Sequence, residues 1–229
     1  AAVSRSFGKE PFERHDIDLG KKIAGYIGEM INLITAVNDA NESAEIENIT
    51  DTASKVQKLL LPKNLKKNPA LDIGEYFLQA RGICSDYYDV IVQQNRIFIV
   101  VADIAGKSIQ SAVVMVMLRA ILYLITNTNQ STEAILDWLN KGITGKIDID
   151  HFASISLLCY EPEKKSLEFI GAGNQAMLLY KAGSKKAEIF QQKTDPIGVD
   201  VRSSYKSRVI PLEKGDTVLL YTDGVIECL

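Results

Sequence analysis

Residues 97–103, Ile-Phe-Ile-Val-Val-Ala-Asp, decide how this chain folds, because an unbroken run of strand-forming apolar residues ends in an aspartate. An apolar run of this kind, bounded by a turn signal, predicts a buried β-strand. Gly106 follows closely and lets the backbone turn after the strand. The strand therefore delivers the carboxylate of Asp103 to its end, where hard divalent cations are commonly bound.

Two further acidic sites repeat this design. Residues 217–222 form a second apolar run that leads into Asp223, and residues 84–90 carry Asp86 and Asp89. Any one aspartate at such a position is better explained by ordinary turn chemistry. Acidic residues at three predicted strand ends, taken together, predict a metal centre.

From residue 70 onward the chain has the period of β-strands, interrupted by two helical segments. We expect strands at 71–77, 88–93, 96–102, 152–160, 166–170, 176–180, 187–190, 205–210 and 216–221, and helices at 108–125 and 132–143. Turn signals at 94–95 and 161–165 link neighbouring strands as hairpins. Consecutive hairpins favour an antiparallel sheet, and the inserted helices favour a layer outside it.

The first part of the chain has helical periodicity. In residues 16–38 the apolar positions Ile23, Ile27, Met30, Ile34 and Val37 form a heptad seam. We expect a polar patch at 38–43 to interrupt the helix and a second seam to follow over 46–60, ending before Pro62. Helices this short need a partner: each other, the following domain or a second copy of the chain.

Bulk composition narrows the function classes. The net charge of -3 and the pI near 5.5 provide no general attraction to nucleic acid. Three cysteines without metal-ligand spacing argue against disulfides and zinc, so a reducing cytoplasm fits best. No apolar run is long enough to span a membrane. Both chain ends are expected to be cuts in a longer protein, so a membrane anchor in the parent protein stays open.

Six segments follow one another in the order seen in a known family. SDYYDV, VVADIAGKS, FASISLLCY, GAGNQAMLLY, DPIG and LLYTDGVIE resemble the motifs of bacterial PP2C-like serine/threonine phosphatases of the SpoIIE and RsbU type. The resemblance covers residues 56–229 and implies an α+β fold, an antiparallel β-sandwich flanked by helices. Residues 62–229 would be the phosphatase domain, incomplete at its C-terminus, and residues 1–61 a helical signalling or dimerisation linker.

The resemblance also implies a site with two Mn²⁺ or Mg²⁺ ions. Asp103 would bridge both ions, the backbone carbonyl of Ile104 would be a further ligand, and Asp223 would bind one ion. Asp86 would lie at the same centre, directly or through water. Lys107, at the head of the long helix, would attract the phosphate or assist the leaving serine oxygen; a merely solvated lysine is the alternative.

The chain departs from the family pattern at several points. Cys84 and Ser85 stand where the family usually has glycines, and Asp89 is expected only to orient its neighbours. The family's final metal-binding aspartate follows the TDG motif and would lie beyond Leu229. That ligand is therefore either outside the given residues or missing from a weakened site.

Three functions remain open from the sequence. The first is a metal-dependent protein serine/threonine phosphatase; by resemblance its substrate is a phosphorylated anti-anti-sigma factor of the STAS type in a partner-switching pathway. The linker would then carry a signal from an upstream sensor domain, with a homodimer as one arrangement and no nucleic acid involved. The second is a non-catalytic module that binds a phosphoprotein, and the third is a hydrolase of small phosphate esters. The residues beyond 229 would distinguish the first function from the second. An assay with a phosphoserine protein beside one with a generic phosphate ester would distinguish the first from the third.

Overall fold

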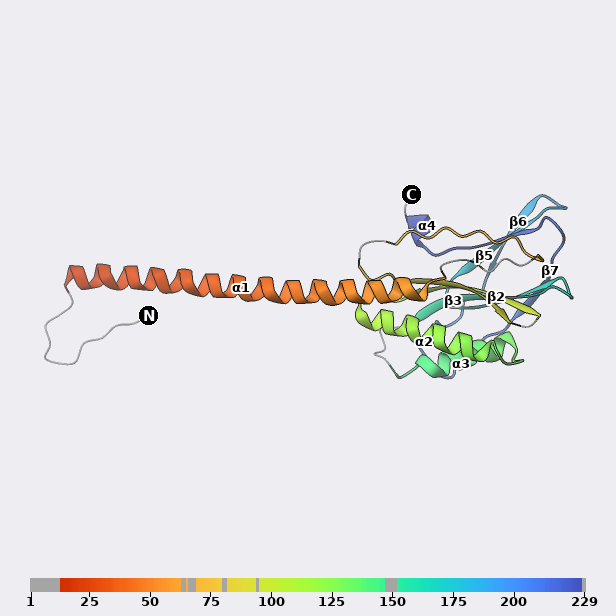
Figure 1. The fold of residues 1–229 in the computed structure, drawn as a ribbon, viewed down its shortest axis with the longest axis horizontal. Helices are drawn as coiled ribbons and strands as arrows, with labels where there is room; N and C mark the ends of the chain where they lie inside the picture. The colour runs from red at the N-terminus through yellow and green to blue at the C-terminus, as the bar shows by residue number, and fades with distance from the viewer. Residues whose placement is uncertain are drawn as a thin grey trace. The chain divides into compact units, whose positions relative to one another are not determined.

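The computed structural model describes residues 13–62, 65, 69–79, 82–93, 95–146 and 152–227 (Figure 1). The chain divides into two compact units, Ala1–Ile49 and Thr50–Leu229. Within the described ranges, none of the helices has the length and hydropathy that crossing a membrane requires.

Helix α1 runs without interruption over Arg14–Leu60. The expected break at residues 38–43 is wrong. That patch contains polar residues but neither glycine nor proline, and each of its residues lowers helix propensity by less than about 1 kcal/mol. The helix ends before Pro62, as predicted. Its last turns, from Thr50 onward, belong to the second unit.

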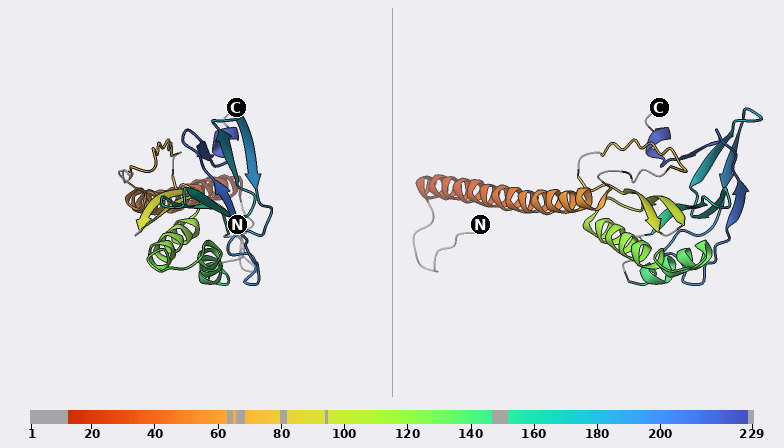
Figure 2. Two further views of the ribbon diagram at one scale, coloured as in Figure 1. Left: turned by 90° about the vertical axis from the view of Figure 1, so that its right-hand side faces the viewer. Right: turned by 45° about the vertical axis from the view of Figure 1, so that its right-hand side comes forward.

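The second unit contains two antiparallel sheets (Figures 1 and 2). The larger has the order β1-β2-β3-β4-β7, formed by Asp86–Gln93, Arg96–Ile104, Ala153–Glu161, Ser166–Ala172 and Arg208–Pro211. The smaller has the order β6-β5-β8, formed by Lys186–Gln191, Ala176–Lys181 and Thr217–Leu220. Every pairing between neighbouring strands is antiparallel, which confirms the predicted sheet type.

Two hydrophobic cores fix the order of the layers. Helices α2 (Ile109–Ile125) and α3 (Thr132–Ile143) pack on one face of the five-stranded sheet, and Leu118 and Leu139 lie in that core (Figure 2). The other core lies between the sheets, where Phe169 of β4 meets Met177 of β5. The predicted antiparallel α+β sandwich with helices outside it is confirmed. A short helix, α4 (Gly224–Glu227), follows β8.

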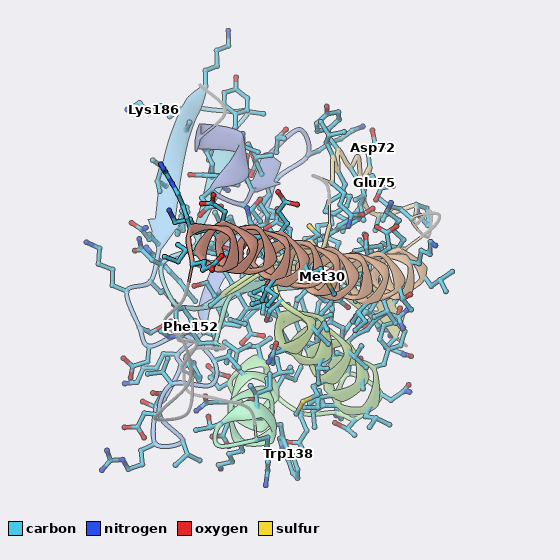
Figure 3. All side chains as sticks on the ribbon, turned by 90° about the vertical axis from the view of Figure 1, so that its left-hand side faces the viewer. Met30, Asp72, Glu75, Trp138, Phe152 and Lys186 are labelled. Carbon is cyan, nitrogen blue, oxygen red and sulfur yellow. The ribbon has the colours of Figure 1, made fainter. Side chains whose placement is uncertain are left out.

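One predicted strand is wrong. Residues 72–79 have no regular secondary structure, Leu71 forms only an isolated bridge, and the segment joins neither sheet. Its exposed side chains include Asp72 and Glu75 (Figure 3), while the ring of Phe77 packs against that of Tyr88 with centroids 5.4 Å apart. The alternation of apolar and polar residues that predicts a strand is a property of local sequence. Joining a sheet also requires a hydrogen-bonded neighbouring strand, which that alternation does not specify.

Candidate metal centre

Asp86 and Asp103 lie directly opposite each other where β1 begins and β2 ends. Opposed residues in an antiparallel pair point to the same face of a sheet. On these two strands that face carries Val90 and Ile99, which are also paired and which pack into the core between the sheets. The alternation of side chains therefore places both carboxylates on the inter-sheet side, at the edge of the apolar core.

The end of β8 reaches the same place from the other sheet. The hydroxyl of Thr222 donates a hydrogen bond of 2.9 Å to Oδ2 of Asp86, across a sequence separation of 136 residues. Burial raises the pKa of Asp86, and the negative charge of the adjacent Asp223 raises it further. The structure thus brings the three predicted acidic strand ends of Asp86, Asp103 and Asp223 into one region.

The environment of this region disfavours the ionised forms of Asp86 and Cys84. Burial is the main cause that raises the pKa of Asp86, and Asp223 adds to it; the hydrogen bond from Thr222 and the charge of Lys107 act in the opposite direction. Burial also raises the pKa of the neighbouring Cys84 thiol, with a further contribution from the charge of Asp103. A bound cation would offset this repulsion between carboxylates.

The turn after Asp103 is built from backbone hydrogen bonds. The Ile104 amide donates to the carbonyl of Ser85 at 3.0 Å, and the Ala105 amide donates to the carbonyl of Phe152 at 2.7 Å. Gly106 then adopts a φ of 86°, which a residue with a Cβ rarely adopts. The Ile104 side chain is a hydrocarbon buried in the helix-side core, so this residue could bind a metal only through its backbone oxygen.

Lys107 lies just before the N-terminus of α2 and is exposed. The helix begins with a capping box in which Ser108, the N-cap residue, exchanges hydrogen bonds with Ser111. Since the charge of Lys107 lowers the pKa of Asp86, the ammonium group acts on the acidic region. A solvated lysine and a phosphate-attracting lysine both agree with this position.

Asp89 lies on the opposite face of β1, toward the helices. Its side chain is 2% exposed, and its carboxylate accepts hydrogen bonds from the Tyr87 hydroxyl at 3.0 Å and from the Val90 amide at 2.8 Å. Nε of Arg119 on α2 lies 3.6 Å from Oδ2. Burial raises the pKa of Tyr87, and Asp89 adds to the effect. Asp89 therefore connects β1 to α2, away from the acidic region.

The sequence did not indicate the role of Gln57. This residue of α1 is 1% exposed, and its side-chain amide clamps the backbone of Cys84: Nε2 donates to the carbonyl at 2.8 Å, and Oε1 accepts from the amide at 2.9 Å. Cys84 stands two residues before Asp86. The only sequence signal was a glutamine inside an otherwise amphipathic helix, which is too weak to single out a contact of this kind.

The donor atoms suit a hard cation, because Mg²⁺ and Mn²⁺ prefer carboxylate and carbonyl oxygens. Within the ranges that the structure describes, however, no group of three or more His, Cys, Asp or Glu side chains is arranged to hold a metal ion. The ligand roles of Asp86, Asp103, Ile104 and Asp223 stay predictions.

This arrangement of sheets and helices is that of the PP2C-type phosphatase domains. The SiaA PP2C domain of Pseudomonas aeruginosa matches with a TM-score of 0.61 and 19% identity, over 80% of this chain and 74% of that one. The structure of RsbX in complex with magnesium matches with a TM-score of 0.54 and 19% identity, over 62% of this chain and 67% of that one. At these identities the likeness concerns the fold.

The chain belongs to the SpoIIE family: the family model described as stage II sporulation protein E (SpoIIE) matches residues 93–229, more than half of its length. It is similar to the phosphoserine phosphatase RsbU of Bacillus subtilis (strain 168), with 28% identity over 184 residues. That match covers 80% of this chain and 55% of the relative, so the chain spans about half the length of RsbU.

Proposed function

We propose that this chain is a metal-dependent phosphatase that hydrolyses phosphoserine or phosphothreonine in a protein substrate. The observation that carries the proposal is the position of three aspartates. Asp86 and Asp103 are paired between β1 and β2, and Asp223, next to Thr222, acts on Asp86 from the end of the other sheet. Carboxylates gathered at the edge of a core, with one cationic neighbour, suit a divalent cation better than a structural role. Membership of the SpoIIE family and the similarity to RsbU support the same activity.

In the proposed site, residues on three segments have different roles. Asp86, Asp103, the carbonyl of Ile104 and Asp223 would hold two Mn²⁺ or Mg²⁺ ions, which supply an activated water and bind the phosphoryl oxygens. Lys107, exposed beside α2, would offset the phosphate charge or stabilise the leaving oxygen. The Thr222 hydroxyl, by donating to Oδ2 of Asp86, favours the ionised carboxylate that a metal ligand requires.

The proposed substrate is a small phosphorylated protein, an anti-anti-sigma factor of the STAS type. The support is the order of the motifs and the similarity to a relative that is named as a phosphoserine phosphatase. In this proposal the chain acts in a partner-switching pathway that regulates a sigma factor.

The test is phosphate release by the full-length protein from a phosphoserine STAS-domain protein and from p-nitrophenyl phosphate, each with Mn²⁺ and with EDTA. We expect Mn²⁺-dependent release that strongly favours the phosphoprotein. Mn²⁺ affinity should also weaken as the pH falls, beginning at a higher pH than for an ordinary aspartate ligand, because protons compete for the Asp86 carboxylate, whose pKa is raised by burial.

Two other outcomes would contradict the proposal. Hydrolysis of p-nitrophenyl phosphate without action on the phosphoprotein would assign a small-ester hydrolase. Binding of the phosphoprotein without turnover at any Mn²⁺ concentration would assign a non-catalytic module. The latter is the second candidate function, and the lack of a three-residue ligand cluster within the described ranges favours it.

We also infer that α1 is a dimerising linker that receives a signal from an upstream sensor domain. Two residues of the predicted seam, Ile27 and Met30, are 48% and 63% exposed, and Ile31 beside them is 58% exposed (Met30 in Figure 3). Such an apolar stripe normally has a partner. Ile27→Glu should shift the protein toward monomer in sedimentation. An unchanged oligomeric state with a melting temperature several degrees lower would instead indicate that the seam covers the chain's own core.

A further inference from the structure

Gln175 contacts the backbone of the strand that carries Asp103. The side chain comes from the loop between β4 and β5, and its amide faces two groups of β2. With the amide oriented so that each group has a partner, nitrogen donates to the Val101 carbonyl at 3.0 Å and oxygen accepts from the Asp103 amide at 3.1 Å. A carbonyl only accepts and a backbone amide only donates, so this is the orientation of the Gln175 amide that satisfies both.

The loop that presents Gln175 lies directly on the neighbouring strand. Gly173 has a φ of 84°, and a Cβ at this position would lie 2.4 Å from Oγ of Ser154, the residue of β3 paired with Asp103. The Gly173 amide donates to the Asp195 carbonyl at 3.3 Å, and its carbonyl accepts from the Thr194 amide at 3.3 Å. The loop is thus held closely beside the strand pair that carries Asp103.

Resting on the proposed function, we propose that Gln175 is a positioning residue that sets the direction of the Asp103 carboxylate. Asp103 is the penultimate residue of β2, where the chain leaves the sheet. A side chain that holds the Asp103 amide and the carbonyl two residues earlier restricts the backbone angles of that segment. Those angles direct the carboxylate, and ligands and catalytic groups must be held within a fraction of an ångström.

Gln191 provides a matched control. It is a glutamine whose Nε2 donates to the same loop, at 2.9 Å to the Asn174 carbonyl and 3.0 Å to Asn174 Oδ1. These hydrogen bonds reach the loop and not β2. Gln191→Leu therefore removes a loop contact of the same chemistry without touching the backbone of Asp103.

The test compares Gln175→Leu and Gln175→Met with Gln191→Leu in the full-length protein. The readouts are kcat and KM on the phosphoprotein, Mn²⁺ affinity by electron paramagnetic resonance, and melting temperature. We expect both Gln175 variants to lower kcat about tenfold or more and to weaken Mn²⁺ binding several-fold, with KM nearly unchanged. Gln191→Leu should leave kcat and Mn²⁺ affinity at wild-type values. Because Met keeps the unbranched length of Gln, it serves if the Leu variant does not fold.

The positioning role is overturned if both folded Gln175 variants keep wild-type kcat and Mn²⁺ affinity. A loss that Gln191→Leu shares, together with an equal fall in melting temperature, would assign the effect to general loop stability and also overturn it. The experiment distinguishes failure of the proposed function from failure of the positioning role. A wild-type protein that binds Mn²⁺ but is inactive refutes the proposed function, and the Mn²⁺ affinities of the variants still decide the role of Gln175. A wild type that binds no Mn²⁺ refutes both.

Discussion

Asp103→Asn is expected to lower Mn²⁺-dependent dephosphorylation by at least about a hundredfold while the fold is retained. Asparagine keeps the size of the side chain and one acceptor oxygen but removes the negative charge that offsets a divalent cation. Because Asp103 is only partly buried at a strand end, the melting temperature should change by a few degrees at most. The measurement is kcat over a range of Mn²⁺ concentrations, with melting recorded on the same sample.

Asp89→Asn is the matched control, because it makes the same change on the paired strand but on the opposite face. Here the carboxylate is buried against Arg119, so its loss leaves a cation without its partner and should lower stability. The folded fraction should nevertheless turn over substrate at the wild-type rate. An Asp103→Asn protein with a wild-type rate at saturating Mn²⁺ would rule out the bridging role.

Gln57→Leu is expected to lower the free energy of unfolding by about 2–4 kcal/mol. The substitution deprives the amide and the carbonyl of Cys84 of their partners. Each unsatisfied backbone group costs about 1–3 kcal/mol when it is fully buried, and because Cys84 is only partly buried, we expect the lower part of the summed range. It also releases the segment that leads into Asp86, so kcat and Mn²⁺ affinity should fall in the protein that remains folded. Denaturant unfolding followed by fluorescence, with kinetics at low temperature, measures both effects.

Lys58→Leu is the control for Gln57→Leu, since Lys58 is the next residue of α1 and is exposed. It should change stability by less than about 0.5 kcal/mol, as is usual for surface positions. If Gln57→Leu were equally mild, the double hydrogen bond to Cys84 would contribute little, and Gln57 would have no part in holding the start of β1.

Local patterns predicted most of the second unit. Residues 96–102 were expected as a strand and lie in β2, and the helices expected at 108–125 and 132–143 match α2 and α3 within one residue. These elements have a regular repeat of apolar residues, clear helix caps and short connections. Residues close together in the sequence therefore determine where each element begins and ends. In α1 the same approach wrongly predicted a break at the polar patch 38–43. Residues of modest helix propensity do not interrupt a long helix.

By itself, the sequence determined the antiparallel α+β architecture, the strand-end aspartates and the family resemblance, because apolar period, turn residues and motif order are all properties of local sequence. Only the tertiary structure decided which aspartates lie together: the register pairs Asp86 with Asp103, while the alternation of β1 turns Asp89 toward α2. It also brought Gln57 and Gln175 onto the backbone beside these carboxylates. Such contacts join residues far apart in the chain, and a one-residue change of register would exchange the two faces of a strand.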